Sequence, residues 1–304
     1  MKIQWVSNHP EAPSGYGSQT RQVGLRIAKA GYDIEFVAND GTRGDTLWND
    51  LLVRGSGTDR YSRDTARQDL ERSKADWVIC LYDVWVYTEG VTDPFEGMPH
   101  VAGWVPVDHW PAPPTILPFC RDHTPIAMSR YGYDRLVDQS EHDKSIGEAG
   151  FPVWYAPHAV DDAFVPTELM PSTGRRFREV INVPEDAFLV GIVAANTNTA
   201  VYDRKGFGDM IQAAGAFMRE HPDAYLYLHT LIDGIRGIDL RVLLTMERVP
   251  ARCSTPSSSP GLLVVASSTS TSSRSTPSAT SRASCWAPPA SVLVIRRRGS
   301  TRIP

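Results

Sequence analysis

Apolar and polar stretches alternate along the chain in a way that predicts strands and helices in turn, most clearly between residues 188 and 229. The apolar run 188–195 is rich in β-branched residues and predicts a strand buried on both faces of a parallel sheet. A second such run, 224–229, predicts the next strand. Between the two, apolar residues recur at helical spacing, which predicts a helix packed on the sheet by one face. The recurring positions are Phe207, Met210, Ile211, Ala214, Phe217 and Met218.

The polar loop between the first of these strands and the helix opens with Asn196 and ends in Arg204-Lys205-Gly206. It follows the carboxyl end of a predicted strand, which is where open α/β sheets bind ligands. Two adjacent cations beside a helix N-terminus favour an anion, most simply a phosphate. The alternative is a solvated pair of surface side chains. We expect the phosphate site, because the pair lies between a buried strand and an amphipathic helix.

The start of the chain predicts a similar arrangement, with strands at 2–7 and 33–38 and a helix between them. Gly15 and Gly17 lie in the loop after the first strand, as in a Rossmann-like fold. A glycine there lets backbone N–H groups approach a ligand closely. The third glycine of the dinucleotide-binding fingerprint is missing, so a plain tight turn is the alternative.

Further strands at 75–83, 100–107, 125–128 and 153–158 alternate with helical stretches, which predicts a doubly wound parallel sheet. We also expect a helix whose buried side includes Trp48, Leu51 and Leu52, and another over 173–183. The predicted fold class is therefore α/β with two Rossmann-like domains. The first domain spans 1–165, and the second, which is partial, spans 166–248.

The charge is unevenly distributed along the 304 residues, whose net charge is −4. Residues 1–248 hold 35 acidic and 24 basic residues, a net charge of −11, which argues against a nucleic-acid-binding protein. No apolar run reaches the roughly 20 residues of a membrane span, and no signal peptide is evident in 1–20. The four cysteines form no CxxC pair and no metal spacing. We expect a cytoplasmic protein without a metal site.

Residues 249–304 differ in composition from the rest of the chain: they hold 15 serines and seven arginines but no acidic residue. At the acidic frequency of the preceding residues, about eight would be expected. A disordered Ser/Thr/Pro tract is one explanation, although such tracts normally also carry Glu, Gln and Lys. Out-of-frame translation of GC-rich coding DNA is the other, and we favour it. The second domain is then incomplete and is followed by a disordered or non-native tail.

Three short motifs follow one another over residues 1–245. The glycine loop comes first, then the segment 158–166 (His-Ala-Val-Asp-Asp-Ala-Phe-Val-Pro), then Arg204-Lys205-Gly206 at the start of a helix. In this order they resemble the retaining glycosyltransferases of the GT-B fold, family four. The chain departs from the family pattern at Ala159, where the linker usually has glycine. It also departs at Arg204, which many relatives place several residues before the lysine.

The resemblance implies an enzyme that binds a nucleotide-diphosphate sugar between two Rossmann-like domains and transfers the sugar to an acceptor hydroxyl with retention. No metal and no further cofactor would be needed. Lys205 and Arg204 would meet the charge that develops on the leaving diphosphate. Backbone amides of Gly15 and Gly17 would approach it from the other side, and Asn196 would be a further contact.

His109 lies where relatives often place a polar group beside the transferred sugar, and Asp108 would orient it or contact the acceptor. The resemblance therefore implies that these two residues are catalytic. Because no acidic residue follows Glu247, we expect the chain to transfer sugar weakly. Two other functions stay open: a non-catalytic nucleotide-sugar or phosphate-binding protein, and a sugar epimerase of the GT-B fold.

Overall fold

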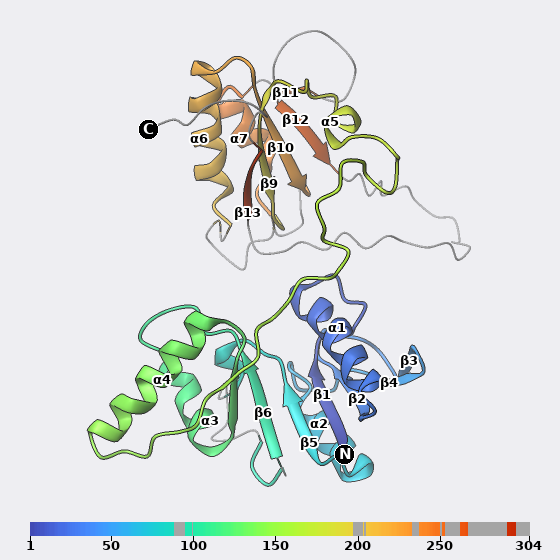
Figure 1. The fold of residues 1–304 in the computed structure, drawn as a ribbon, viewed down its shortest axis with the longest axis vertical. Helices are drawn as coiled ribbons and strands as arrows, with labels where there is room; N and C mark the ends of the chain where they lie inside the picture. The colour runs from blue at the N-terminus through green and yellow to red at the C-terminus, as the bar shows by residue number, and fades with distance from the viewer. Residues whose placement is uncertain are drawn as a thin grey trace. The chain divides into compact units, whose positions relative to one another are not determined.

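A computed structural model describes residues 1–87, 95–98, 100–196, 203, 205–232 and 237–249, together with the backbone of Ala251–Arg252, Leu262–Ala266 and Ser291–Ile295. The chain divides into two compact units, Met1–Phe164 and Val165–Pro304 (Figure 1). Each unit contains its own sheet and helices. The predicted α/β fold with two Rossmann-like units, the pair found in GT-B proteins, is confirmed.

The first unit is built on an eight-stranded sheet with the strand order β3-β4-β2-β1-β5-β6-β7-β8. All neighbouring strands pair in parallel except β3 and β4, which are antiparallel. The strands are β1 (Lys2–Ser7), β2 (Asp33–Ala38), β3 (Thr46–Trp48), β4 (Leu51–Arg54), β5 (Trp77–Cys80), β6 (His100–Val105), β7 (Thr124–Ala127) and β8 (Trp154–Tyr155).

Helices cover both faces of this sheet, which explains why its strands are apolar on both sides. Trp5 and Val6 are neighbours in β1, and they belong to two different buried clusters. The cluster around Trp5 includes residues of α1 (Gly15–Lys29), whereas the one around Val6 includes residues of the other helices. Those helices are α2 (Arg63–Ser73), the 3₁₀ helices η1 (Val84–Tyr87) and η2 (Pro114–Ile116), α3 (Leu117–Asp122) and α4 (Arg130–Ser145).

The second unit contains the strand–loop–helix–strand sequence predicted from the apolar pattern. β9 (Phe188–Val193) pairs in parallel with β10 (Ala224–Thr230), and α6 (Phe207–Glu220) connects them and packs on them. The sheet has the order β11-β12-β10-β9-β13. The remaining elements are α5 (Phe177–Val180), α7 (Leu240–Met246), β11 (Ala251–Arg252), β12 (Leu262–Ala266) and β13 (Ser291–Ile295).

Three strands of this second sheet come from the segment 249–304. β12 pairs in parallel with β10, β11 pairs with β12, and β13 runs antiparallel to β9. The sheet therefore has five strands, more than the partial domain expected from residues 166–248 alone. The remaining residues of the segment lie outside the described part of the chain, so its disorder and its reading frame stay predictions.

Two predicted helices are wrong. The residues expected to form a helix around Trp48 instead form the hairpin β3–β4, because Asn49 and Asp50 both adopt positive φ, 48° and 62°. Two such residues in succession define a tight turn that matches the twist of a hairpin. The helix expected over 173–183 is reduced to α5, because Gly174 (φ 64°) and Asn182 (φ 52°) interrupt the helical backbone on either side.

Candidate active site

The order of the first sheet places a topological switch point at β1. The chain passes from β1 to β2 on one side, and β5 lies on the other side of β1. Open α/β sheets bind ligands outside the carboxyl ends of the strands at such a point. Asn8 follows β1 there, Asp83 follows β5, and Asp108 and His109 follow β6. We call this region the carboxyl edge of the first sheet.

The first turn of α1 lies at this edge, and Ser14 caps it. The Ser14 Oγ accepts a hydrogen bond from the Gly17 N–H at 3.0 Å and another from the Asn8 side-chain amide at 2.7 Å. A capping oxygen of this kind satisfies one of the amides that a helix start leaves without an internal partner. The Gly17 amide is therefore engaged by the protein itself.

Gly15 and Gly17, which the sequence places in a loop, lie in the first turn of α1, and their structural environments differ. A Cβ on Gly17 would lie 2.5 Å from the carbonyl oxygen of Ala12 and 2.9 Å from that of His9, whereas a Cβ on Gly15 would meet no atom within 4 Å. Gly17 is thus required for the close approach of the preceding loop to the helix. The contact of either glycine with a diphosphate stays a prediction, and the open surroundings favour Gly15 for it.

Tyr16, between these glycines, donates a hydrogen bond to Asp83 Oδ1 at 2.5 Å. Burial, followed by the nearby charge of Asp83 and, less strongly, that of Asp108, raises the pKa of the Tyr16 hydroxyl well above its usual value. The hydroxyl therefore keeps its proton and donates it in a short hydrogen bond to the Asp83 carboxylate. The sequence gives no signal for this pair, because its two residues lie 67 positions apart in the chain.

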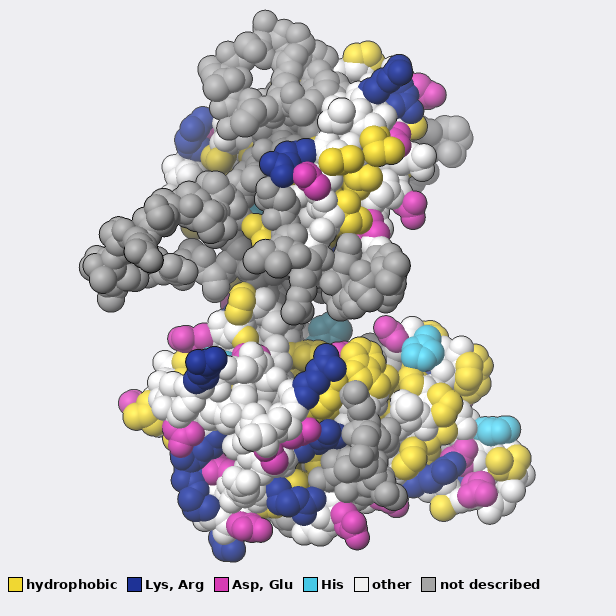
Figure 2. Space-filling model, turned by 180° about the vertical axis from the view of Figure 1, so that it is seen from behind, with side chains coloured by type: hydrophobic (Ala, Val, Ile, Leu, Met, Phe, Trp, Pro, Cys, Tyr) yellow, Lys and Arg dark blue, Asp and Glu magenta, His cyan; other side chains and the backbone are white. Residues whose placement is uncertain are grey.

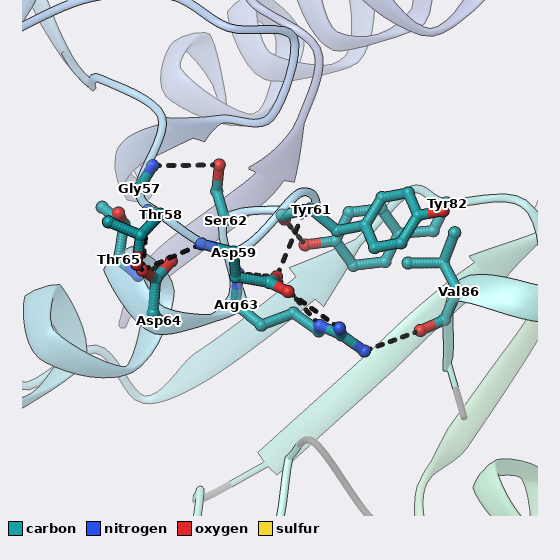
Figure 3. A network of polar contacts seen from close by, with 10 residues as sticks. All are labelled: Gly57, Thr58, Asp59, Tyr61, Ser62, Arg63, Asp64, Thr65, Tyr82 and Val86. Carbon is teal, nitrogen blue, oxygen red and sulfur yellow. Dashed lines mark hydrogen bonds and ion pairs between the residues drawn. The ribbon is translucent and has the colours of Figure 1, made fainter. Parts of the chain in front are cut away.

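A polar network holds the chain on both sides of Asp83 (Figure 3). The Tyr82 hydroxyl donates to the carbonyl oxygen of Tyr61 at 2.8 Å, and Arg63 Nη1 donates to that of Val86 at 3.2 Å. Arg63 is itself fixed by a two-pronged contact with Asp59, at 2.8 and 2.9 Å, and its hydrogen bonds lower the pKa of that carboxyl. The start of α2 thus fixes the loop that carries Asp83.

The two predicted catalytic residues lie on the loop after β6. His109 Nδ1 and Asp108 Oδ1 are 2.9 Å apart, and both side chains are exposed, 57% for the histidine and 87% for the aspartate. Because β5 and β6 are neighbouring parallel strands, Asp83 and the Asp108–His109 pair both follow the carboxyl ends of adjacent strands. The structure therefore brings two acid–base pairs to one edge of the first sheet.

Of the two predicted phosphate-binding cations in the second unit, the structure describes one. Arg204 lies outside the described residues, and Lys205 is half-buried in the turn before α6. The Asp203 carboxylate accepts a hydrogen bond from the Gly208 N–H at 2.6 Å. One amide of the helix start is therefore occupied by a carboxylate of the protein, where a phosphate oxygen was expected to bind.

Asn196 is 3% exposed, and its side chain is committed to backbone groups. Its Nδ2 donates to the carbonyl oxygens of Leu231 (2.9 Å) and Ile238 (2.7 Å), and its Oδ1 accepts from the Ile238 N–H at 3.0 Å. These bonds tie the end of β9 to the chain after β10. We therefore assign the Asn196 side chain a structural role, and its contact with a diphosphate stays a prediction.

The described part of the chain contains neither a cluster of metal-binding side chains nor a membrane-spanning helix. No group of three or more His, Cys, Asp or Glu side chains among them is placed to hold a metal ion. None of the helices in the same part of the chain is long and apolar enough to cross a membrane.

No protein-family model and no curated protein matches the sequence, whereas solved structures do. MnaA of S. aureus in a co-structure with UDP matches at 10% identity with a TM-score of 0.47. The UDP-GlcNAc 2-epimerase of Methanocaldococcus jannaschii matches at 12% identity with a TM-score of 0.45. A Listeria monocytogenes protein described as a UDP-N-acetylglucosamine 2-epimerase matches at 9% identity with a TM-score of 0.44. These matches cover 81%, 82% and 81% of this chain, which spans 64%, 69% and 65% of those proteins.

The predicted transfer of a sugar with retention is corrected at this point. Two of the three named structures are UDP-GlcNAc 2-epimerases, the third was determined with UDP, and none is a glycosyltransferase. Of the functions that the sequence leaves open, the GT-B epimerase is taken up below.

Proposed function

We propose that the chain binds a nucleotide sugar and epimerises the sugar by proton transfer. The observation that carries the proposal is that the Tyr16–Asp83 and Asp108–His109 pairs both lie at the carboxyl edge of the first sheet, after the neighbouring strands β5 and β6, where α/β folds bind ligands. Each of these four side chains has a role in the proposed reaction.

Inverting a carbon centre by proton transfer requires one group to take the proton and another to return one to the opposite face of the same carbon. The electron pair of the broken C2–H bond forms a C1–C2 double bond and expels the diphosphate from C1. Protonation of C2 on the opposite face and return of the diphosphate oxygen to C1 restore both bonds, so the reaction is balanced without an oxidant or another acceptor. Asp83 and the Asp108–His109 pair provide two separate acid–base groups for this exchange. Tyr16, which stays protonated, orients Asp83 through the hydrogen bond that it donates.

The phosphates of a nucleotide sugar need positive charge. We propose that Lys205, together with Arg204, binds a phosphate group in the second unit. Support for Lys205 comes from its place in the turn before α6, since the start of a helix and an ammonium group both attract an anion. Metal ions have no part in the proposed reaction.

The test is incubation of the full chain with UDP-N-acetylglucosamine in D₂O, followed by proton NMR. We expect an epimerised sugar with deuterium at the inverted carbon, and a rate roughly 10²- to 10⁴-fold lower for Asp83→Asn. Asp33→Asn, at the exposed start of β2, is the matched control and should keep the parent rate. Nucleotide-sugar binding without conversion would leave only the binding function, and an unchanged rate for Asp83→Asn would remove Asp83 from the reaction.

A further inference from the structure

Two exposed aromatic side chains meet at one arginine beside the candidate active site. The Arg135 guanidinium lies 5.1 Å from the centre of the Trp110 ring and 5.5 Å from that of Tyr131. Trp110 is 50% exposed and Tyr131 47%. We call these two rings, with the guanidinium between them, the aromatic platform.

Exposure of single apolar side chains is ordinary, and Figure 2 shows many of them scattered among charged groups on one face of the molecule. The platform differs because its parts are fixed. Arg135 is bound to Asp138 at 2.8 Å, and Tyr131, Arg135 and Asp138 lie at helical spacing on α4. Cation–π contact then holds the Trp110 ring against the helix.

The loop that carries Trp110 is anchored at both ends. Val107, before the exposed stretch, is 2% exposed, and Ala112, after it, is 1% exposed. Only the residues between them, 108–111, project from the surface. Trp110 therefore belongs to the same short exposed stretch as Asp108 and His109, which precede it along the chain.

We propose that the aromatic platform binds the pyranose ring of the substrate, which rests on the proposed function and names the part of the substrate that this surface takes. The C–H bonds on one face of a pyranose pack on an aromatic ring, and its hydroxyls need acceptors and donors at the rim. Asp108 and His109 supply these one and two residues away. A diphosphate is disfavoured here, because Asp83 and Asp108 repel it and Arg135 is already paired with Asp138.

The experiment measures binding of UDP, UDP-N-acetylglucosamine and free N-acetylglucosamine to the full chain, by calorimetry for the nucleotides and saturation-transfer NMR for the free sugar. For Trp110→Ala we expect about a 2- to 12-fold loss of affinity for the nucleotide sugar and an unchanged affinity for UDP. Trp110→Phe, which keeps a ring, should retain most of the affinity. Trp154→Ala is the matched control, since Trp154 is 62% exposed and lies on β8.

The outcomes separate this proposal from the proposed function. Equal losses for UDP and the nucleotide sugar, or no loss with Trp110→Ala, would overturn the platform and leave the function standing. Free-sugar binding that Trp110→Ala abolishes, without any nucleotide binding, would keep the platform and remove the function. A parent chain that binds none of the three probes would overturn both.

Discussion

Two buried carboxyl groups face each other between the first sheet and α2, and they make the stability of the first unit depend on pH. Glu35 on β2 and Asp69 on α2 are each 5% exposed. Asp69 binds Arg54 Nε at 2.8 Å and accepts from the Gln4 amide at 3.2 Å. Burial, followed by the neighbouring Glu35 carboxyl, raises the pKa of Asp69 to about 6.

The sign of the effect follows from the direction of this shift. A carboxyl whose pKa is raised on folding stabilises the folded state below the pKa of the unfolded chain, about 3.9, and loses that contribution as the pH rises through the folded value. For Asp69, the contribution is therefore lost between about pH 4 and pH 6. A difference of about 2 pKa units corresponds to roughly 3 kcal/mol.

We expect Glu35→Gln to remove part of this pH dependence, because it removes the neighbouring negative charge and leaves the burial unchanged. The loss of unfolding free energy between pH 4 and pH 7 should shrink by about 1–2 kcal/mol relative to the parent. Glu35 Oε1 is buried without a hydrogen-bond partner among the described residues, whereas Oε2 pairs with Lys2 Nζ at 3.3 Å, and the amide oxygen of the variant can still accept a hydrogen bond from that ammonium group.

Urea unfolding followed by tryptophan fluorescence measures this effect in the relevant unit, because seven of the eight tryptophans lie within residues 1–164. The control is Asp33→Asn, which removes a carboxylate from the same strand at a side chain that is 68% exposed. An identical pH dependence in Glu35→Gln and the parent would refute the coupling between Glu35 and Asp69.

Four further predictions concern single features. Gly17→Ala should lower the unfolding free energy of the first unit by about 1–3 kcal/mol through overpacking, and equal melting temperatures for it and Gly15→Ala would contradict the different surroundings of the two glycines. In limited proteolysis of Asn196→Ala, the second unit should be cleaved before the first, since about 2–4 kcal/mol of buried hydrogen bonding is lost. The same order of cleavage in the variant and the parent chain would contradict this prediction. Lys205→Ala should weaken UDP binding in calorimetry, and equal affinities would remove Lys205 from the site. Translating the coding DNA of 249–304 in its other frames should restore a mixed acidic composition in one of them, and early stop codons in both would refute the frame change.

The elements that depend on one dominant pattern could be predicted from the sequence. β9, α6 and β10 were found because each is long, apolar on the correct period and bounded by polar residues. The β3–β4 hairpin was missed because Trp48, Leu51 and Leu52 also fit helical spacing. The positive φ angles of Asn49 and Asp50 are the feature that distinguishes the hairpin from a helix at these residues.

The candidate site shows a similar division. The family resemblance points to Asp108 and His109, which follow an apolar strand of the parallel sheet, and their catalytic role stays a prediction. Tyr16 and Asp83 could not be predicted, since their hydrogen bond joins residues that only the strand order brings together. For Asn196, the sequence could not predict the bond to Ile238, which lies 42 residues later in the chain, and its contact with a ligand stays a prediction.

The charges of the described candidate residues fit different parts of a nucleotide sugar. An edge that exchanges protons with a sugar needs carboxylates, and the first sheet supplies Asp83 and Asp108 there. Each would oppose a phosphate charge by about 4 kcal/mol at 4 Å for an effective dielectric constant of about 20, so a phosphate group is disfavoured directly beside either carboxylate. Lys205, beside the start of α6, is the cation that we propose for phosphate binding. Loss of UDP binding in Lys205→Ala and loss of turnover in Asp83→Asn should therefore be separate effects, one on affinity and the other on rate.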